Sequence, residues 1–178
     1  MAAAAQELPD GLERDRHLEQ AAHPVRVWGR RTLLLATVAL PVLALFNVFG
    51  QRATTTSAGS PKATLSVHAP ARLRGGLLYQ TRFTISAHRQ IKSLSLVLSP
   101  GWFDGLTVNA AEPQPSQEAS KNGSVSLTYG AVDAGKRLIA FIYWQVNPTT
   151  VAARDVTADT YDGKTHLAHV HRNLAVLP

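Results

Sequence analysis

Three histidines close to the C-terminus, His166, His169 and His171, form the most metal-like group of residues in the sequence. Side chains alternate between the two faces of a β-strand, so we expect His169 and His171 to share one face and His166 to lie on the other. Two imidazoles do not complete a metal site. A polar outer face on an edge strand is therefore the favoured interpretation, and the sequence predicts no metal and no cofactor. The candidates for a third ligand are Asp159, Asp162 and His68.

Other kinds of chemistry lack their characteristic residues. The chain contains no cysteine, which excludes disulfide bonds, cysteine-ligated zinc, iron–sulfur clusters and thiol nucleophiles. It also contains no nucleophile elbow, phosphate-binding glycine loop, His-Glu-x-x-His motif or paired-carboxylate motif. We therefore expect a protein that is not an enzyme.

Two large aromatic residues, Trp102 and Phe103, stand in a turn-rich segment that is bounded by Ser99 and Gly105. Trp102 could fold back and close one end of the domain, or the pair could project as an anchor for a partner. The first interpretation is favoured. The following residues, 109–121, contain two prolines and mostly polar side chains, so we expect a long surface loop there.

The net charge of +6 is distributed unevenly. Residues 1–31 contain five acidic residues and five arginines, whereas the chain from residue 60 onward contains twelve Lys/Arg and seven Asp/Glu. This excess is scattered over many segments without a dense basic run, so nucleic acid is not expected as a partner. Arginine outnumbers lysine by thirteen to five, which is typical of a GC-rich bacterial genome.

Residues 32–50 form an apolar stretch without one formal charge. As a helix, these nineteen residues would extend over roughly 28 Å, close to the thickness of the hydrocarbon core of a bilayer. Pro41 and Asn47 are the two residues of this stretch that are not expected simply to pack against lipid chains. The sequence therefore predicts a transmembrane helix. The expected anchoring residues are Trp28, Arg30, Arg31, Leu33, Leu34, Leu35, Leu40, Leu43, Leu45 and Phe46.

The charges on either side of this stretch predict its orientation. Five arginines lie in residues 12–31, whereas only Arg52 and Lys62 lie in residues 51–70. The positive-inside rule therefore places the N-terminus in the cytoplasm. A cleaved signal peptide is the alternative, but the long preceding segment and the length of the apolar run favour a retained anchor in the cell membrane.

The composition divides the chain into four parts. Residues 1–31 are expected to be a polar cytoplasmic tail, and residues 32–50 the transmembrane helix. Residues 51–62, which are small and polar, are expected to be a flexible linker. Residues 63–178 are expected to form an extracytoplasmic domain.

Alternating apolar residues between Gly, Pro, Asn and Asp punctuation predict an all-β domain of seven to nine strands. The run 138–146 is apolar at nearly every position, which predicts a central strand covered on both faces, with Trp144 as the core aromatic residue. The pairs Asn122-Gly123 and Asp162-Gly163 favour tight hairpins. An antiparallel β-sandwich of about seven strands, similar in fold to immunoglobulin domains but without their paired cysteines, fits these features.

These features favour a single-pass membrane protein with a non-catalytic extracytoplasmic interaction module, an accessory or structural subunit of a larger membrane complex. The expected partners are the lipid bilayer and other membrane protein subunits. The expected contact residues are Trp102, Phe103, Pro41 and Asn47. One alternative is a surface module that binds a metal, a glycan or another small ligand through His169 and His171. A weaker alternative is a transmembrane sensor.

Overall fold

The computed structural model describes residues 24–46 and 51–177 of the chain. It divides into two compact units, residues 1–49 and residues 50–178. The described part of the first unit is an α-helix, α2 (Pro24–Leu45). The second unit is built from β-strands and one short 3-10 helix.

Helix α2 begins at Pro24, eight residues before the apolar stretch that the sequence predicts as the membrane span. Proline suits the first turn of a helix because its ring fixes φ near the helical value and its missing N–H would have no partner there. The segment Val27–Leu45 is long and apolar enough to cross a membrane, and none of it is buried in the structure. Membrane anchors and signal sequences both contain segments of this kind.

Two hydroxyl groups within the helix are satisfied by its own backbone. Thr32 Oγ1 donates to the carbonyl oxygen of Trp28 over 2.8 Å, and Thr37 Oγ1 donates to that of Leu33 over 2.9 Å. A hydroxyl that bonds to the preceding turn has no need of a water molecule. The two threonines are therefore compatible with an apolar environment.

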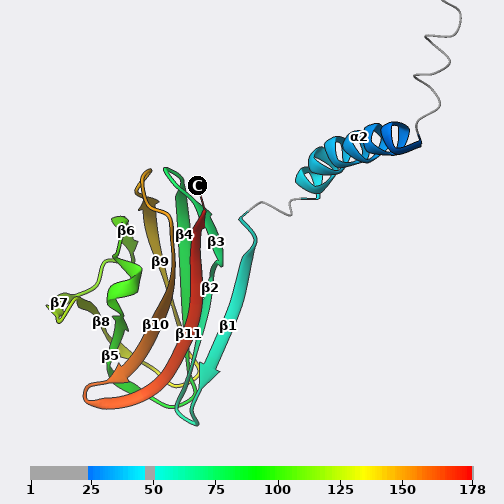
Figure 1. The fold of residues 1–178 in the computed structure, drawn as a ribbon. Helices are drawn as coiled ribbons and strands as arrows, with labels where there is room; N and C mark the ends of the chain where they lie inside the picture. Colours follow the sequence, from blue (N-terminus) through cyan, green and yellow to red (C-terminus); the bar gives the residue numbers. More distant parts are fainter. Residues whose placement is uncertain (1–23, 47–50, 178) are drawn as a thin grey trace, which may run out of the picture. The chain divides into compact units, whose positions relative to one another are not determined.

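The second unit is a β-sandwich of two sheets (Figure 1). In one sheet the strands follow the order β1-β2-β4-β9-β6, and in the other the order β3-β11-β10-β5-β8-β7. All pairings are antiparallel except that of β3 with the end of β11. The strands are β1 (Ala53–Gly59), β2 (Ala63–Pro70), β3 (Arg72–Arg74), β4 (Leu78–Ala87), β5 (Ile91–Leu98), β6 (Leu106–Glu112), β7 (Gln117–Lys121), β8 (Ser124–Val132), β9 (Arg137–Val146), β10 (Ala152–Asp162) and β11 (Thr165–Leu177).

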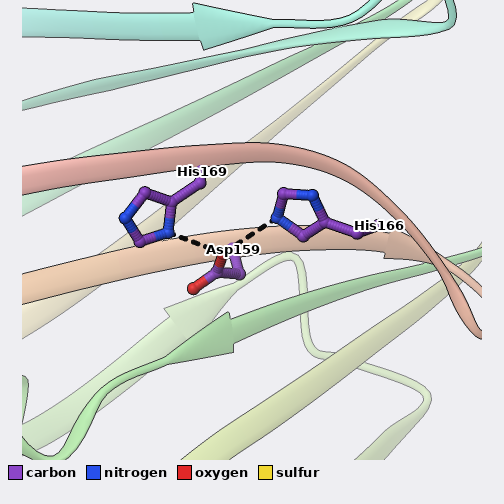
Figure 2. Close-up of side chains that lie close together, drawn as sticks. All are labelled: Asp159, His166 and His169. Carbon is purple, nitrogen blue, oxygen red and sulfur yellow. Dashed lines mark hydrogen bonds and ion pairs between the residues drawn. The ribbon is translucent and has the colours of Figure 1, made fainter.

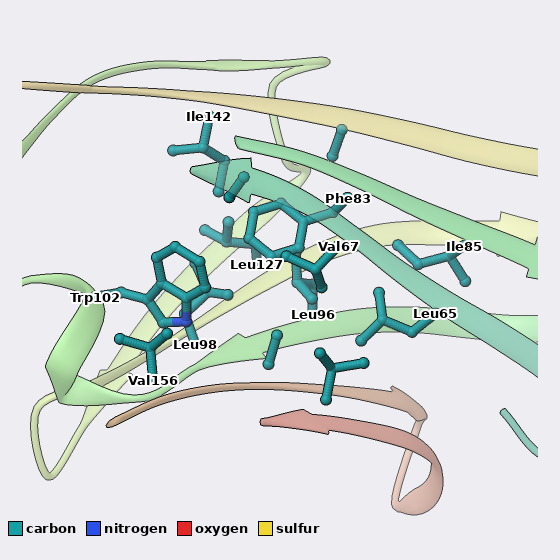
Figure 3. Packing of buried hydrophobic residues seen from close by; sticks show 14 of the residues in the cluster. Leu65, Val67, Phe83, Ile85, Leu96, Leu98, Trp102, Leu127, Ile142 and Val156 are labelled. Atoms are coloured by element: carbon teal, nitrogen blue, oxygen red, sulfur yellow. The ribbon is translucent and has the colours of Figure 1, made fainter. Parts of the chain in front are cut away.

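Alternation of apolar and polar residues places the core between the two sheets, as the sequence predicts. Along β4, for example, every second side chain is buried. The inward side chains of the two sheets pack against one another, as Figure 3 shows for a part of this core. The immunoglobulin-like sandwich is thus confirmed, but the described residues form eleven strands rather than about seven. Its fully buried large side chains include Phe83, Trp102, Trp144, Leu65, Ile85, Leu96 and Ile142.

Strand β9, which contains the apolar run 138–146, differs in part from the prediction. Trp144 is completely buried, so its assignment to the core is confirmed. The strand lies between β4 and β6 rather than at the centre of its sheet, and only alternate side chains along it are fully buried. Ile139, on the opposite face, is 38% exposed. A continuous apolar run therefore does not show that both faces of a strand are covered.

The prediction of a flexible linker over residues 51–62 is wrong for most of that range. Residues 53–59 form β1, which pairs with β2 from Ala53 opposite Pro70 to Gly59 opposite Thr64. Three consecutive threonines in this segment favour a strand because β-branched side chains fit a pleated surface. Only residues 46–52 separate the end of α2 from the start of β1.

Arg172 on β11 holds β1 against the rest of the sandwich. Its side chain points into the protein and is 7% exposed. It donates hydrogen bonds to the carbonyl oxygens of Thr54, Val67 and Ala69 over 2.7–2.9 Å, and to the hydroxyl groups of Thr54 and Thr56. Burial lowers the pKa of Arg172, since it disfavours the charged form. The five hydrogen-bond acceptors around the guanidinium group offset the cost of burying its charge.

Two tight hairpins use positive backbone φ angles. Asn122 and Gly123, between β7 and β8, have φ of 52° and 76°, as a type I′ turn requires. The hairpin between β10 and β11 is one residue further along than predicted, because Asp162 pairs with Thr165 and the loop is Gly163-Lys164. Asp162 is therefore the last residue of a strand rather than part of the loop.

The predicted surface loop over residues 109–121 is replaced in large part by strands. Strand β6 continues to Glu112, and β7 occupies Gln117–Lys121 at the edge of the second sheet. All five side chains of β7 are exposed, so its sequence carries no apolar alternation. Its backbone is ordered by pairing with β8, which the local sequence does not reveal.

Candidate functional site

A β-bulge near the start of β11 determines where the histidines lie. Thr160 of β10 is opposite Ala168, and the next residue, Tyr161, is opposite His166. Leu167 therefore has no partner in the ladder. An extra residue of this kind shifts the alternation of side chains by one position.

The bulge brings all three histidines to one face of the sheet. Leu167 and Ala168 are neighbours in the chain, yet both are buried. His166 on one side of them, and His169 and His171 on the other, are all exposed. The prediction that His169 and His171 share a face agrees with the structure, whereas the prediction that His166 lies on the opposite face is wrong. The strict alternation on which it rests fails at the bulge.

Asp159 on β10 lies between two of these histidines (Figure 2). Its Oδ1 atom is 3.0 Å from Nε2 of His166 and 2.8 Å from Nδ1 of His169. The side chain of Asp159 is 20% exposed, and those of His166 and His169 are 47% and 52% exposed. The three ligand atoms lie within 4.8 Å of one another, so these residues could hold a metal ion.

Two neighbouring contacts extend this arrangement. The ring of Tyr161 packs edge-on against the imidazole of His166, with 5.2 Å between the ring centroids. Further along the same face, Nε2 of His171 is 3.1 Å from Oδ1 of Asp155. His171 thus pairs with a carboxylate of its own and does not join Asp159.

The other candidates for a third ligand have different partners. Nδ1 of His68 lies 2.8 Å from Oγ1 of Thr55 on β1. The carboxylate of Asp162 accepts hydrogen bonds from the backbone N–H groups of Lys92 and Ser93, both over 2.9 Å, and forms an ion pair with Lys62. Neither side chain contributes to the cluster around Asp159.

The partners of Asp162 give this residue a structural role that depends on pH. The hydrogen bond from Lys62, and then the two backbone N–H groups, lower its pKa below the ordinary value. A lowered pKa means that the ionised carboxylate stabilises the fold at neutral pH. This contribution is lost when the pH falls through the pKa of the folded state.

We expect Asp162→Asn to lower the free energy of unfolding by about 1–2 kcal/mol at neutral pH, because asparagine keeps an acceptor but lacks the charge that pairs with Lys62. The difference from the wild type should shrink below about pH 4, where this carboxylate becomes protonated in the unfolded chain, and should vanish below the lower pKa of the folded state. Urea unfolding followed by circular dichroism at several pH values measures this difference. Asp133→Asn, at an exposed aspartate, should show no such dependence. An equal loss at all pH values would contradict the assignment.

Trp102 lies in the 3-10 helix η1 (Pro100–Trp102) and closes one end of the sandwich. Its side chain is 1% exposed, and its Nε1 donates to the carbonyl oxygen of Thr157 over 2.9 Å. The preceding Gly101 permits this close approach, since a Cβ atom there would lie 2.4 Å from the carbonyl oxygen of Asp155. The interpretation of Trp102 as a plug is confirmed, and its assignment as a partner contact is wrong.

Phe103 is partly buried against the same core. Its ring centroid lies 5.6 Å from that of Trp144. It therefore offers little free surface for a partner. Of the predicted contacts in the helix, Pro41 lies inside α2, and Asn47 lies outside the described residues.

The predicted anchoring residues 28, 30, 31, 33–35, 40, 43, 45 and 46 are all exposed. Trp28 is part of the helix rather than of a segment before it, and the guanidinium carbon of Arg31 lies 5.9 Å from the centroid of its ring. An aromatic ring beside a cationic group is typical of the interface between a bilayer and water.

An exposed apolar surface that the sequence did not indicate lies at the end of the sandwich where β1 begins. We call this surface the tether end and define it by Leu77, Leu78, Val151 and Leu177, which are 45%, 65%, 62% and 38% exposed. Strand pairing places these residues near the start of β1. Ala53, the first residue of β1, is opposite Pro70 at the end of β2. The short strand β3 follows β2, and its last residue, Arg74, is opposite Leu177 and accepts a hydrogen bond from the N–H of Leu77. Exposed Arg72 and Arg74 flank it.

A groove of about 480 Å³ begins at Leu78 of the tether end. It is lined by residues of β4, β9 and β6. Its lining is mixed, with the remaining wall formed by Tyr79, Gln80, Asn109, Ala110, Tyr143 and Trp144. A groove with apolar and amide groups, next to exposed leucines, is a surface that could receive a protein segment.

No family model and no curated protein matches the sequence. Among solved structures, the chain is similar to the N-terminal domain of the Streptococcus gordonii adhesin Sgo0707, with 13% identity and a TM-score of 0.47 over 66% of this chain. The match spans one third (33%) of the adhesin chain. The chain is also similar to CaCohA2 from Clostridium acetobutylicum, with 16% identity and a TM-score of 0.43 over 63% of this chain and 88% of that one. A non-cellulosomal cohesin from Archaeoglobus fulgidus matches with 17% identity and a TM-score of 0.40 over 70% and 92% of the two chains.

Proposed function

We propose that this protein is a membrane-anchored, extracytoplasmic interaction module without catalytic activity, which acts as an accessory subunit of a larger membrane protein complex. The carrying observation is the apolar segment Val27–Leu45, of which no part is buried in the structure. Such a segment in water would expose many apolar side chains, and a bilayer removes that penalty. The five arginines in residues 12–31, two of which lie at the start of this segment, outnumber the two basic residues in residues 51–70 and support a cytoplasmic N-terminus.

Little sequence separates the proposed membrane segment from the sandwich, since only residues 46–52 lie between α2 and β1. The chain enters the sandwich at Ala53, and the tether end lies at this same end of the domain. We therefore propose the tether end as the surface that a partner in the same membrane contacts.

The composition of the tether end favours a protein partner. Its four apolar side chains are 38–65% exposed at one end of the sandwich, whereas exposed apolar residues that are scattered singly are ordinary on a protein surface. The adjoining groove lets a partner bury Leu78 and reach the polar side chains of Gln80 and Asn109. Apolar anchors surrounded by hydrogen-bonding groups are the usual composition of a protein interface.

Three single-cysteine variants test the proposal, since the wild-type chain has no cysteine to replace first. We expect Ala119→Cys, on the exposed edge strand β7, to react with a membrane-impermeant maleimide in intact spheroplasts. Gln6→Cys should react only after the membrane is opened. Leu78→Cys should react slowly in native membranes, because a partner covers it, and fast in the detergent-purified protein.

Each part of the proposal has a result that contradicts it. Labelling of Gln6→Cys in intact spheroplasts would contradict the proposed orientation. A mass that shows a mature protein without the residues before residue 51 would contradict the proposal of a retained anchor. The occupant of the tether end is decided by reconstitution of the purified Leu78→Cys protein into liposomes. Fast labelling there agrees with a protein partner, whereas continued protection would show that lipid covers this surface.

A further inference from the structure

We propose that Asp159, His166 and His169 form a binding site for one divalent transition-metal ion, with Zn²⁺ or Cu²⁺ as the expected occupant. Two imidazole nitrogens and one carboxylate oxygen are ligands that these ions accept. The site is independent of the membrane anchor, since all three residues belong to the hairpin of β10 and β11.

The convergence of the three side chains is the first argument. One oxygen atom, Oδ1 of Asp159, is approached by a ring nitrogen from each of His166 and His169, at 3.0 Å and 2.8 Å (Figure 2). The same three atoms that form these two hydrogen bonds are placed so that one ion could take the position between them. The bulge at Leu167 produces this arrangement, because without it His166 would lie on the other face.

The distances are the second argument. A tetrahedral Zn²⁺ with bonds of about 2.0–2.1 Å holds its ligand atoms roughly 3.3–3.4 Å apart. The two nitrogens lie within 3.0 Å of the oxygen, and all three atoms lie within 4.8 Å of one another. Lengthening the two N–O distances by roughly half an ångström, and shortening the N–N distance by at most about 1.4 Å, would therefore accommodate the ion, and rotation of exposed side chains can supply such shifts.

The surroundings also favour the site. Tyr161 packs against the edge of the His166 ring and restricts its rotation, as supporting side chains do at metal sites. About half of each imidazole side chain is exposed, so an ion can enter from water. The open side leaves at least one coordination position for a water molecule or for a donor atom of another protein.

His171 provides a matched control because it lies on the same face and also pairs with a carboxylate. Its partner is Asp155, and it is outside the group of three ligand atoms. If metal bound to surface histidines in general, loss of His171 and loss of His169 would weaken metal binding equally. A specific site would weaken only on loss of His169.

Calorimetric titration of the full-length protein in detergent, purified without a histidine tag, tests the proposal with ZnCl₂ and CuSO₄. We expect one ion per wild-type chain with an affinity in the micromolar range or tighter. His166→Gln, His169→Gln and Asp159→Asn should each weaken binding by at least about tenfold, whereas His171→Gln should leave it unchanged. Far-ultraviolet circular dichroism of each variant confirms that the sandwich is folded.

Paramagnetic resonance of the Cu²⁺ form gives a second readout that does not depend on affinity. The wild type and His171→Gln should show coupling to two imidazole nitrogens, and His169→Gln to one. The proposal is overturned if the wild type shows no saturable binding, or if His171→Gln weakens binding as much as His169→Gln. It is also overturned if the Cu²⁺ forms of His171→Gln and His169→Gln show coupling to the same number of imidazole nitrogens.

Discussion

Trp102→Ala is expected to lower the free energy of unfolding of the sandwich by about 3–5 kcal/mol, the range observed when a buried aromatic side chain is truncated. The indole is almost fully buried and contacts two other rings: its centroid lies 5.7 Å from that of Phe83 and 5.6 Å from that of Trp144. Alanine leaves a cavity between the sheets. It also leaves the carbonyl oxygen of Thr157 without its indole donor.

Urea unfolding of the full-length protein in detergent, followed by far-ultraviolet circular dichroism, measures this effect without relying on tryptophan fluorescence. Trp102→Phe should lie between the wild type and Trp102→Ala, because it keeps an aromatic ring but loses the hydrogen bond. Trp28→Ala is the control, since Trp28 is 65% exposed on α2 and does not belong to the sandwich. A loss below about 1 kcal/mol for Trp102→Ala would show that the loop does not close the core.

Arg172→Met is expected to release β1 from the sandwich rather than to unfold the whole domain. Methionine has a similar length and removes the buried charge, but it donates no hydrogen bonds. The carbonyl oxygens of Thr54, Val67 and Ala69 then lose a donor in the interior. Opening of β1 lets water reach these oxygens, so we expect the free energy of local opening to fall by about 3 kcal/mol.

Hydrogen exchange monitored by mass spectrometry measures this local effect. A change of about 3 kcal/mol corresponds to exchange roughly 100-fold faster for the amides of β1. Peptides from β9 and β10 should change much less. Arg82→Met, at an exposed arginine on β4, is the matched control and should not alter β1. Unchanged protection of β1 in Arg172→Met would show that pairing with β2 alone is sufficient.

Local patterns were sufficient to predict most of the sandwich. Strands such as β4 and β10 alternate between apolar and polar residues because one face is buried and the other faces water. The turn at Asn122-Gly123 was predictable because both positions require positive φ. These signals act between neighbours in the chain, so a single sequence contains them.

The strands that the sequence missed depend on contacts between distant residues. The polar segment of β1 resembles a linker, and it becomes a strand through pairing with β2 and through the side chain of Arg172, more than one hundred residues away. Strand β7 is exposed along its whole length and depends on β8. Neither partner can be identified from the composition of the segment itself.

The candidate metal site was predictable in part. The histidines near the C-terminus were identified, and Asp159 was among the possible third ligands. The sequence paired His171 with His169, whereas the structure groups His166 with His169 and Asp159, because the bulge at Leu167 changes the face of the β11 side chains that precede it. Nothing in the residues Leu167 and Ala168 distinguishes this bulge from regular alternation.

The hydrogen bonds of Arg172 have a mechanical consequence for a protein tethered through its first strand. Tension between a membrane anchor and a bound partner would enter the sandwich at Ala53 and would tend to peel β1 away from β2 one pair at a time. Thr54 and Thr56 lie close to Ala53 in the chain, and both accept hydrogen bonds from the guanidinium group of Arg172. Under the proposed anchoring, several hydrogen bonds of Arg172 would have to break together before β1 could separate from β2, so this residue would raise the force needed to start unfolding.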